Sequence, residues 1–118
     1  MNERLTPVER IRKKSDFAGL YRRGSRFRGR LFTLVFLPNG LGHARLAVVA
    51  NRKVGGAVVR NRVKRRFREL FRREKERLRE PLDLIVIARP ESGEAPWAVL
   101  REAYLSALTT IFRKRMAS

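Results

Sequence analysis

The sequence predicts an α+β fold in which helices pack on a mixed central sheet, as a two-layer α/β sandwich. Three observations lead to this prediction: apolar strand-like segments at 31–37, 45–50 and 82–88, a long amphipathic segment at 57–79, and a helical apolar repeat near the C-terminus. The expected order is helix, strands, long helix, strand, helix. A length of 118 residues with 43% hydrophobic residues suits one globular domain, 1–118.

A short helix is expected near the N-terminus. Ser15 is a suitable N-cap, and Gly24 is a suitable left-handed stop. Phe17, Leu20 and Tyr21 lie at i, i+3 and i+4, so they share one face of this helix.

Strand formers dominate the next part of the chain. The apolar segments 31–37 and 45–50 are separated by a turn at 38–42, and this short connection predicts a β-hairpin. Gly29 indicates a break or bulge at the start of the first strand. The segment 82–88 predicts a third apolar strand, which follows the long helix.

The long helix is predicted at 57–79 from its apolar spacing, with a stop at Pro81. Its apolar residues recur three or four positions apart and are Val59, Val63, Phe67, Leu70 and Phe71. From Arg60 to Arg68 the other face carries six basic residues and no acidic one. A merely solvated helix usually mixes signs and gains from ion pairs one turn apart. The sign bias therefore favours a face that meets a polyanion.

The last helix is predicted to begin near Pro96, a residue that suits a first helical turn. Its apolar stripe has steps of three and four and consists of Trp97, Leu100, Tyr104, Leu108 and Ile111. We expect these aromatic side chains to belong to the core rather than to a ligand site.

The composition points to a nucleic-acid partner. The net charge is +18 and the pI about 11.8, and the basic residues are spread over the whole chain. Such a field attracts polyanions, among which nucleic acid comes before an acidic membrane surface. No apolar run approaches the ~20 residues of a membrane span, and residues 1–14 lack a hydrophobic signal core. We therefore expect a cytoplasmic protein without a membrane or small-molecule partner.

The residues offer no catalytic centre and no metal site. The sequence contains no cysteine and a single histidine, His43, in a turn-like segment. No serine lies in an elbow motif, the acidic residues form no Asp-x-Asp pair, and no phosphate-binding glycine loop is present. We expect the chain to bind rather than to catalyse.

Four ordered segments resemble one family. Arg60-Asn61-Arg62 and the basic residues after it resemble the arginine–asparagine–arginine motif of the bacterial ribonuclease P protein component. Residues 13–24, 51–59 and 83–90 resemble that family's first helix, its glycine turn into the motif helix, and its last strand. Asn51-Arg52 stands where many relatives resemble Ser-Lys.

The resemblance implies a function and an unusual fold detail. It implies an accessory protein subunit of an endoribonuclease whose active site lies in the RNA subunit, with Mg²⁺ held mainly by that RNA. The reaction removes the 5′ leader of precursor tRNA, so the implied partners are the catalytic RNA and precursor tRNA. It also implies a left-handed crossover between the strands that flank the long helix, where chain chirality normally favours a right-handed one.

Two sets of RNA-binding residues follow from the charge pattern and the resemblance together. The set expected to contact the catalytic RNA is Arg52, Lys53, Arg60, Asn61, Arg62, Lys64, Arg65 and Arg68. The set that the resemblance places against the single-stranded leader is Phe17, Tyr21 and Phe36. The residues alone instead favour a packing role, in which Phe17 and Tyr21, with Leu20, seal the first helix onto the sheet.

Two rival functions fit the same composition. A ribosomal or ribosome-assembly RNA-binding protein has the same charge and size, and only the ordered motifs speak against it. A DNA-binding protein usually carries a mixed reading face, whereas this one is almost purely Arg and Lys, which suits phosphates rather than base edges.

Overall fold

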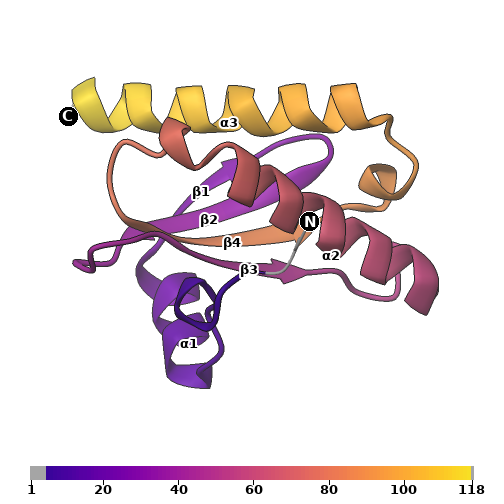
Figure 1. The fold of residues 1–118 in the computed structure, drawn as a ribbon, viewed down its shortest axis with the longest axis horizontal. Coiled ribbons are helices and arrows are strands. Elements are labelled where there is room, and N and C mark those ends of the chain that lie inside the picture. Colours follow the sequence, from indigo (N-terminus) through magenta and orange to yellow (C-terminus); the bar gives the residue numbers. More distant parts are fainter. Residues whose placement is uncertain (1–4, 118) are drawn as a thin grey trace.

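The computed structural model describes residues 5–117 and confirms the α+β class. The strands form one mixed sheet, and the α-helices lie on its two faces (Figure 1). In chain order the elements, with η marking 3-10 turns, are η1 (Pro7–Glu9), α1 (Lys14–Arg23), β1 (Ser25–Arg28), β2 (Phe32–Pro38), β3 (Arg45–Val49), α2 (Ala57–Arg73), η2 (Lys75–Arg77), β4 (Leu82–Ala88), η3 (Pro90–Gly93) and α3 (Trp97–Ala117).

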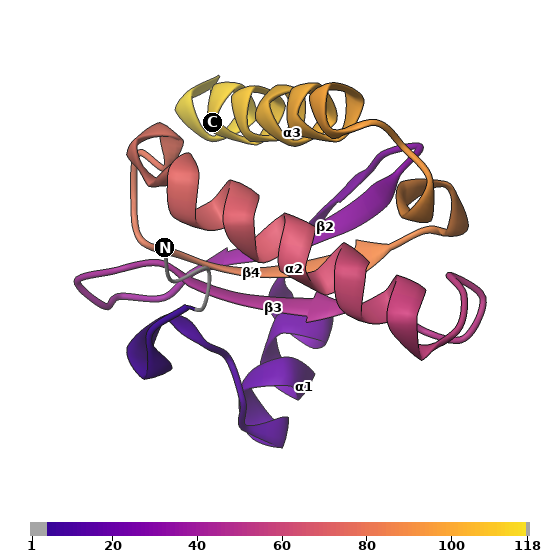
Figure 2. The same ribbon diagram turned by 45° about the vertical axis from the view of Figure 1, so that its right-hand side comes forward.

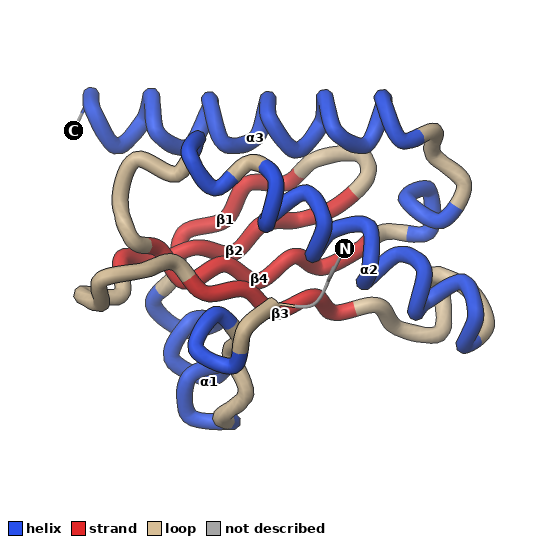
Figure 3. The backbone as a smooth tube through the Cα atoms, viewed as in Figure 1, coloured by secondary structure: helices blue, strands red, loops and turns tan. Residues whose placement is uncertain are grey.

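The strand order is β1-β2-β4-β3 (Figure 3). β2 is antiparallel to both β1 and β4, whereas β3 is parallel to β4. The predicted hairpin between residues 31–37 and 45–50 is therefore wrong, because β4 lies between these two strands. The hairpin that does form joins β1 to β2 at the Gly29 break, where the Gly29 amide donates to the Phe32 carbonyl over 2.9 Å.

The insertion of β4 has a clear physical reason. Six of its seven residues are buried, so it needs cover on both faces and neighbours on both edges. Two strand spacings separate β2 from β3 by ~10 Å, and the six-residue connection 39–44 can span that distance. The Asn39 amide then donates to the Pro81 carbonyl at the start of β4.

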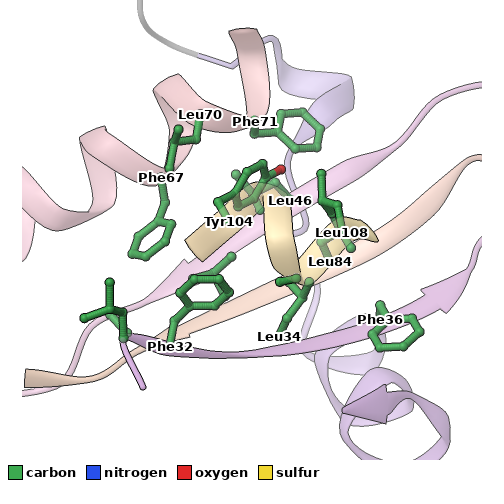
Figure 4. Packing of buried hydrophobic residues seen from close by; sticks show 14 of the residues in the cluster. Phe32, Leu34, Phe36, Leu46, Phe67, Leu70, Phe71, Leu84, Tyr104 and Leu108 are labelled. Atoms are coloured by element: carbon green, nitrogen blue, oxygen red, sulfur yellow. The ribbon is translucent and has the colours of Figure 1, made fainter. Parts of the chain in front are cut away.

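The main core lies between the sheet and the pair α2 and α3, which cover the same face (Figures 1 and 2). Alternate residues of the strands point into it, and Phe32 meets Phe67 edge to face with ring centroids 5.3 Å apart (Figure 4). The sheet and this helix pair form the predicted two layers. α1 packs on the opposite face and covers only part of it. β3, α2 and β4 form the crossover, and its handedness stays a prediction.

Two predicted helix ends differ from the structure. α1 has Lys13 rather than Ser15 at its N-cap position, and Gly24 after it is extended, with φ −70°. Glycine is needed at position 24 because the backbone there lies close to the last turn of α1: a Cβ would lie 2.5 Å from the Leu20 carbonyl oxygen. α2 ends at Arg73, six residues before the predicted 79, and the chain turns through η2 toward β4.

The Tyr104 side chain supports a prediction about stability. It projects from α3 into the main core, where it is fully buried, and its hydroxyl has no hydrogen-bond partner among the described residues (Figure 4). Burial raises the pKa of this phenol, so it stays neutral. An unpaired buried hydroxyl destabilises the folded state, so Tyr104→Phe should raise the free energy of unfolding by about 1 kcal/mol. Urea unfolding measures this; Tyr21→Phe on the surface is the control, and a loss of stability in Tyr104→Phe would contradict the assignment.

Candidate nucleic-acid interface

The first surface is the outer side of the N-terminal half of α2. Asn61, Arg62 and Arg65 are exposed on it, while Arg60, Lys64 and Arg68 are half-buried. Within residues 5–117, none of the six cations from Arg60 to Arg68 has a carboxylate within 4 Å. We call the six predicted residues of this helix the α2 surface: Arg60, Asn61, Arg62, Lys64, Arg65 and Arg68.

The C-terminal end of α2 is different, because its charges are compensated. Glu69 is 6% exposed and accepts hydrogen bonds from Arg72 Nη2 at 2.7 Å and from Arg73 Nε. Glu74 pairs with Arg101 of α3 at 3.2 Å. The charges at the C-terminal end of α2, which faces α3, therefore neutralise one another. The positive charges of its N-terminal half have no acidic partner among the described residues and are open to an external anion.

The Glu69 ion pairs give a pH-dependent stability. Burial raises the pKa of Glu69, but the hydrogen bonds and charges of Arg72 and Arg73 outweigh it, so the pKa is lowered overall. A lowered pKa means that the ion pairs stabilise the fold fully above the unfolded value near 4.5 and that this stability is lost as the pH falls below it. Glu69→Gln should therefore cost about 2 kcal/mol at neutral pH and progressively less in acid. Denaturant unfolding at several pH values measures this, with exposed Glu102→Gln as control; a pH-independent difference would contradict it.

Two arginines of α2 also stabilise the fold, because they donate to backbone carbonyls of the segment that follows β4. Arg62 Nη2 donates to the Gly93 carbonyl at 2.5 Å, so this predicted RNA contact is partly engaged with the η3 turn. Arg66 donates to the carbonyls of Ser92 at 3.3 Å and Ala95 at 2.5 Å. Burial, and then the nearby charge of Arg62, lowers the pKa of Arg66. Arg66 therefore positions the chain between β4 and α3 beneath the α2 surface.

Arg68 lies at the border of the α2 surface, where it turns toward β3. It lines a hollow of about 230 Å³ together with Phe17 of α1 and with Arg10 and Arg12 of the N-terminal segment. Burial, and then repulsion from Arg10, lowers the pKa of Arg68. The sequence alone did not indicate Arg10, because it reaches this place by pairing beside Leu46 at the edge of β3.

Arg52 and Lys53 are exposed in the turn that leads from β3 into α2. The Lys53 amide donates to Asn51 Oδ1 at 3.0 Å, which fixes the turn. Gly55 follows with φ +150°, and a Cβ there would lie 2.9 Å from Val59. The turn thus places two more cations at the start of α2, beside the α2 surface (Figure 2).

The second surface is formed by α1 and the part of the sheet beside it, where Phe17 and Ala47 line the hollow of about 230 Å³; we call this whole surface the cleft. Phe17 is half-buried and Tyr21 is 37% exposed, and their ring centroids are 6.5 Å apart. Because α1 is short, Val35 and Ile85 are fully buried on this face but other sheet residues are only partly covered. The half-buried apolar residues of this face are Leu37, Ala47, Val49 and Ile87.

β1 adds positive charge to this cleft. Arg26 pairs with Val35 and Arg28 with Thr33 across the antiparallel ladder, and directly paired residues point to the same face. Val35 packs in the cluster beneath α1, so both arginines belong to the α1 side. The guanidinium carbon of Arg26 lies 6.0 Å from the Tyr21 ring centroid. The cleft thus combines aromatic rings, an apolar floor and cations.

Phe36 does not belong to this cleft. It is 7% exposed and packs in the main core under α2 and α3, on the opposite face of β2 from Val35 (Figure 4). The prediction that Phe36 contacts the leader is therefore wrong. The residues of β2 that do reach the α1 side are Thr33, Val35 and Leu37, which the strict alternation of a strand requires.

A partly buried ion-pair network fixes α1 beside the cleft. Arg45 of β3 meets Asp83 of β4 through two nitrogens, at 2.9 and 2.6 Å, and reaches Asp16 of α1 at 3.4 Å. Asp83 is 7% exposed and also accepts from Asn39 Nδ2 at 2.9 Å. Hydrogen bonding to Asp83 raises the pKa of Arg45, and burial offsets part of that rise.

Residues 5–117 lack two features, a clustered metal site and a membrane-spanning helix. No three His, Cys, Asp or Glu side chains there come together as a metal-binding group. A Mg²⁺ ion would therefore find no carboxylate cluster among the described residues. No described helix has the length and apolar character needed to cross a bilayer.

Comparison with known proteins identifies the family. The family model described as Ribonuclease P matches residues 5–112. A ribonuclease P protein component from Thermotoga sp. (strain RQ2) is 36% identical over 115 residues, which are 94% of this chain and 98% of the relative. One from Staphylococcus carnosus (strain TM300) is 36% identical over 110 residues, 91% of this chain and 95% of the relative.

Solved structures agree with the sequence relatives. The Staphylococcus aureus RNase P protein aligns with a TM-score of 0.80 at 31% identity, over 87% of this chain and 94% of that chain. The RNase P protein from Thermotoga maritima aligns with a TM-score of 0.78 at 34% identity, over 85% of this chain and 94% of that chain. The chain therefore belongs to the bacterial ribonuclease P protein component family.

Proposed function

We propose that this chain is the protein subunit of ribonuclease P and that it uses its two surfaces for two different RNAs. The α2 surface, with Arg52 and Lys53, binds the structured catalytic RNA. The cleft between α1 and the sheet binds the single-stranded 5′ leader of precursor tRNA. The observation that carries this proposal is the unneutralised charge of the α2 surface in a member of this family.

The chemistry of each surface suits the RNA assigned to it. The α2 surface has cations and an amide but no aromatic side chain, which fits phosphates of a folded RNA rather than its bases. The cleft has Phe17 and Tyr21 with Arg26 and Arg28 beside them, which fits stacked bases and the backbone of an unpaired strand. Precursor tRNA differs from mature tRNA by such a strand.

In this proposal the cleavage chemistry lies in the RNA subunit. Mg²⁺ would be held mainly by that RNA and would supply charge stabilisation and an activated water in the holoenzyme. The residues of this chain bind and position the two RNAs, and none of them exchanges a proton with the substrate. We place the complex in the cytoplasm, where precursor tRNA is made in bacteria.

A binding competition separates this function from the ribosomal alternative. The cognate catalytic RNA, a ribosomal RNA fragment of equal length and duplex DNA would compete for the labelled chain at fixed salt. We expect the catalytic RNA to win by on the order of tenfold or more over both competitors, since shape and loops add to the shared phosphate attraction. Equal competition by the ribosomal fragment would favour the alternative.

The chain by itself should leave RNA intact. We expect no cleavage of precursor tRNA by purified protein that has been freed of RNA, because the described residues hold no activated nucleophile and no metal cluster. Incubation with labelled precursor tRNA and Mg²⁺, followed by gel electrophoresis, measures this. Cleavage that follows the protein through successive columns would contradict the assignment of chemistry to the RNA.

A further inference from the structure

A second hollow adjoins the α2 surface and shares no lining residue with the hollow in the cleft beside α1, which is called the leader cleft from here on. It has a volume of about 470 Å³ and lies where the middle of α2 faces the start of α3. Its lining residues are Arg65, Arg66, Glu69, Arg73 and Trp97. The sequence pattern predicted Trp97 as a core residue, but its indole is only half-buried.

Trp97 and Arg73 face each other across this hollow. The guanidinium carbon of Arg73 lies 5.7 Å from the indole centroid, within the range of a cation–π contact. Arg73 donates a hydrogen bond from Nε to Glu69, which fixes the orientation of the Arg73 side chain. Among the described residues its two Nη nitrogens have no hydrogen-bond partner, so they are free to meet an anion.

Of the two other arginines that line the hollow, one is already hydrogen-bonded within the fold and the other is available to a ligand. Arg66 donates to the Ser92 and Ala95 carbonyls, so it shapes the hollow rather than binding a ligand. Arg65 is exposed and makes no hydrogen bond or ion pair within residues 5–117. It belongs to the α2 surface as well, so the hollow continues that surface along the helix.

We propose that this hollow binds one unpaired nucleotide of RNA, with its base against Trp97 and its phosphate between Arg65 and Arg73. An aromatic face stacks with any base, and the Arg65 guanidinium together with the two Nη nitrogens of Arg73, unpaired within residues 5–117, matches phosphate oxygens. The volume lies in the ~300–1,000 Å³ range of small-ligand sites. An acidic protein segment would use the arginines but would leave the indole without a stacking partner.

The inference rests on the proposed function only in its choice of RNA as the ligand. On the assembled enzyme the nucleotide would come from an unpaired position of the catalytic RNA, because Arg65 already belongs to the surface assigned to that RNA. The leader is assigned to the other face of the sheet. Trp97 thus adds base stacking to a surface that otherwise contacts only phosphates.

Trp97 provides its own test, because it is the only tryptophan of the chain. The full chain is titrated with a short unstructured RNA oligonucleotide while tryptophan fluorescence is recorded. We expect saturable quenching, because a base stacked on the indole quenches it. Arg65→Gln and Arg73→Gln should each weaken the apparent affinity by roughly fivefold. Arg65 makes no contact that folding needs, so its variant remains informative if Arg73→Gln perturbs the ion pair with Glu69.

A matched control is Arg113→Gln, an exposed arginine ~24 Å farther along α3, counted at 1.5 Å per residue. It removes the same charge and should leave the titration unchanged. Phe17→Ala/Tyr21→Ala should also keep the quenching, which separates this hollow from the leader cleft. An equal loss in Arg113→Gln, or equal quenching by an acidic peptide, would overturn the proposal. Missing quenching in a preparation that still stimulates precursor cleavage would refute this site and leave the proposed function intact.

Discussion

Replacing Phe17 and Tyr21 together by alanine should weaken binding of precursor tRNA to the reconstituted complex by about thirtyfold, while binding of mature tRNA stays nearly unchanged. The reason is that an unpaired base loses ~1–3 kcal/mol when its aromatic partner is removed, so two rings account for at least ~2 kcal/mol. Both side chains are open to a ligand, since Tyr21 is 37% exposed and Phe17 is half-buried beside it. Parallel titrations with the two tRNAs measure the difference.

The control for this prediction separates stacking from packing. Phe17→Leu/Tyr21→Leu keeps apolar volume against Leu20 and Val35 but removes the flat rings. If the rings stack on bases, this variant should also lose affinity for precursor tRNA while its thermal stability stays close to that of the parent. If the rings only seal α1 onto the sheet, the leucine variant should bind precursor tRNA as the parent does. The alanine variant should then lose thermal stability and should bind precursor and mature tRNA equally weakly.

The second large effect concerns the α2 surface. Arg65→Ala/Arg68→Ala should weaken binding to the catalytic RNA by about 3 kcal/mol, or roughly a hundredfold, because each arginine makes charge-assisted hydrogen bonds to phosphate. The slope of log affinity against log salt should fall by about two, one for each lost phosphate contact. Titrations at several salt concentrations give both numbers.

The structure suggests unequal shares for the two arginines. Arg65 is exposed and should act through RNA alone, whereas Arg68 is half-buried next to Arg10 and lies toward the leader cleft. Arg68→Ala relieves like-charge repulsion in the free protein, so its folded state should be no less stable than that of the parent. Arg113→Ala/Lys114→Ala at the far end of α3 removes the same charge. If this control weakened RNA binding as much and lowered the slope equally, the effect would come from net charge rather than from the α2 surface.

The long helix and its two faces could be predicted from the sequence, because local spacing decides them. Val63, Phe67 and Leu70 are buried as the repeat requires, and the basic residues opposite them stay outside. The end of the helix could not be predicted, since continuing it costs little locally. Packing decides it instead: Lys75 pairs with Glu9, and the chain then turns toward β4.

The strand order could not be predicted, because it depends on contacts far apart in sequence. Two antiparallel strands with a short connection fit a hairpin locally, and only β4, with six of its seven residues buried, requires the place between them. The same limit explains Phe36. In a strand that is apolar at nearly every position, the sequence does not show which residues face α1 and which face α2. Arg10 and the half-buried Trp97 were missed for this reason as well, since both are placed by distant partners.

The most direct test of the central claim is reconstituted cleavage of precursor tRNA. The cognate catalytic RNA is incubated with substrate at low Mg²⁺, with and without this chain, and the 5′ product is mapped. We expect the chain to accelerate correct removal of the leader greatly, to cleave nothing without the RNA, and to lose this advantage when the leader is trimmed to one or two nucleotides. If the chain bound the catalytic RNA but gave no acceleration at any leader length, its assignment as the protein subunit of ribonuclease P would be contradicted.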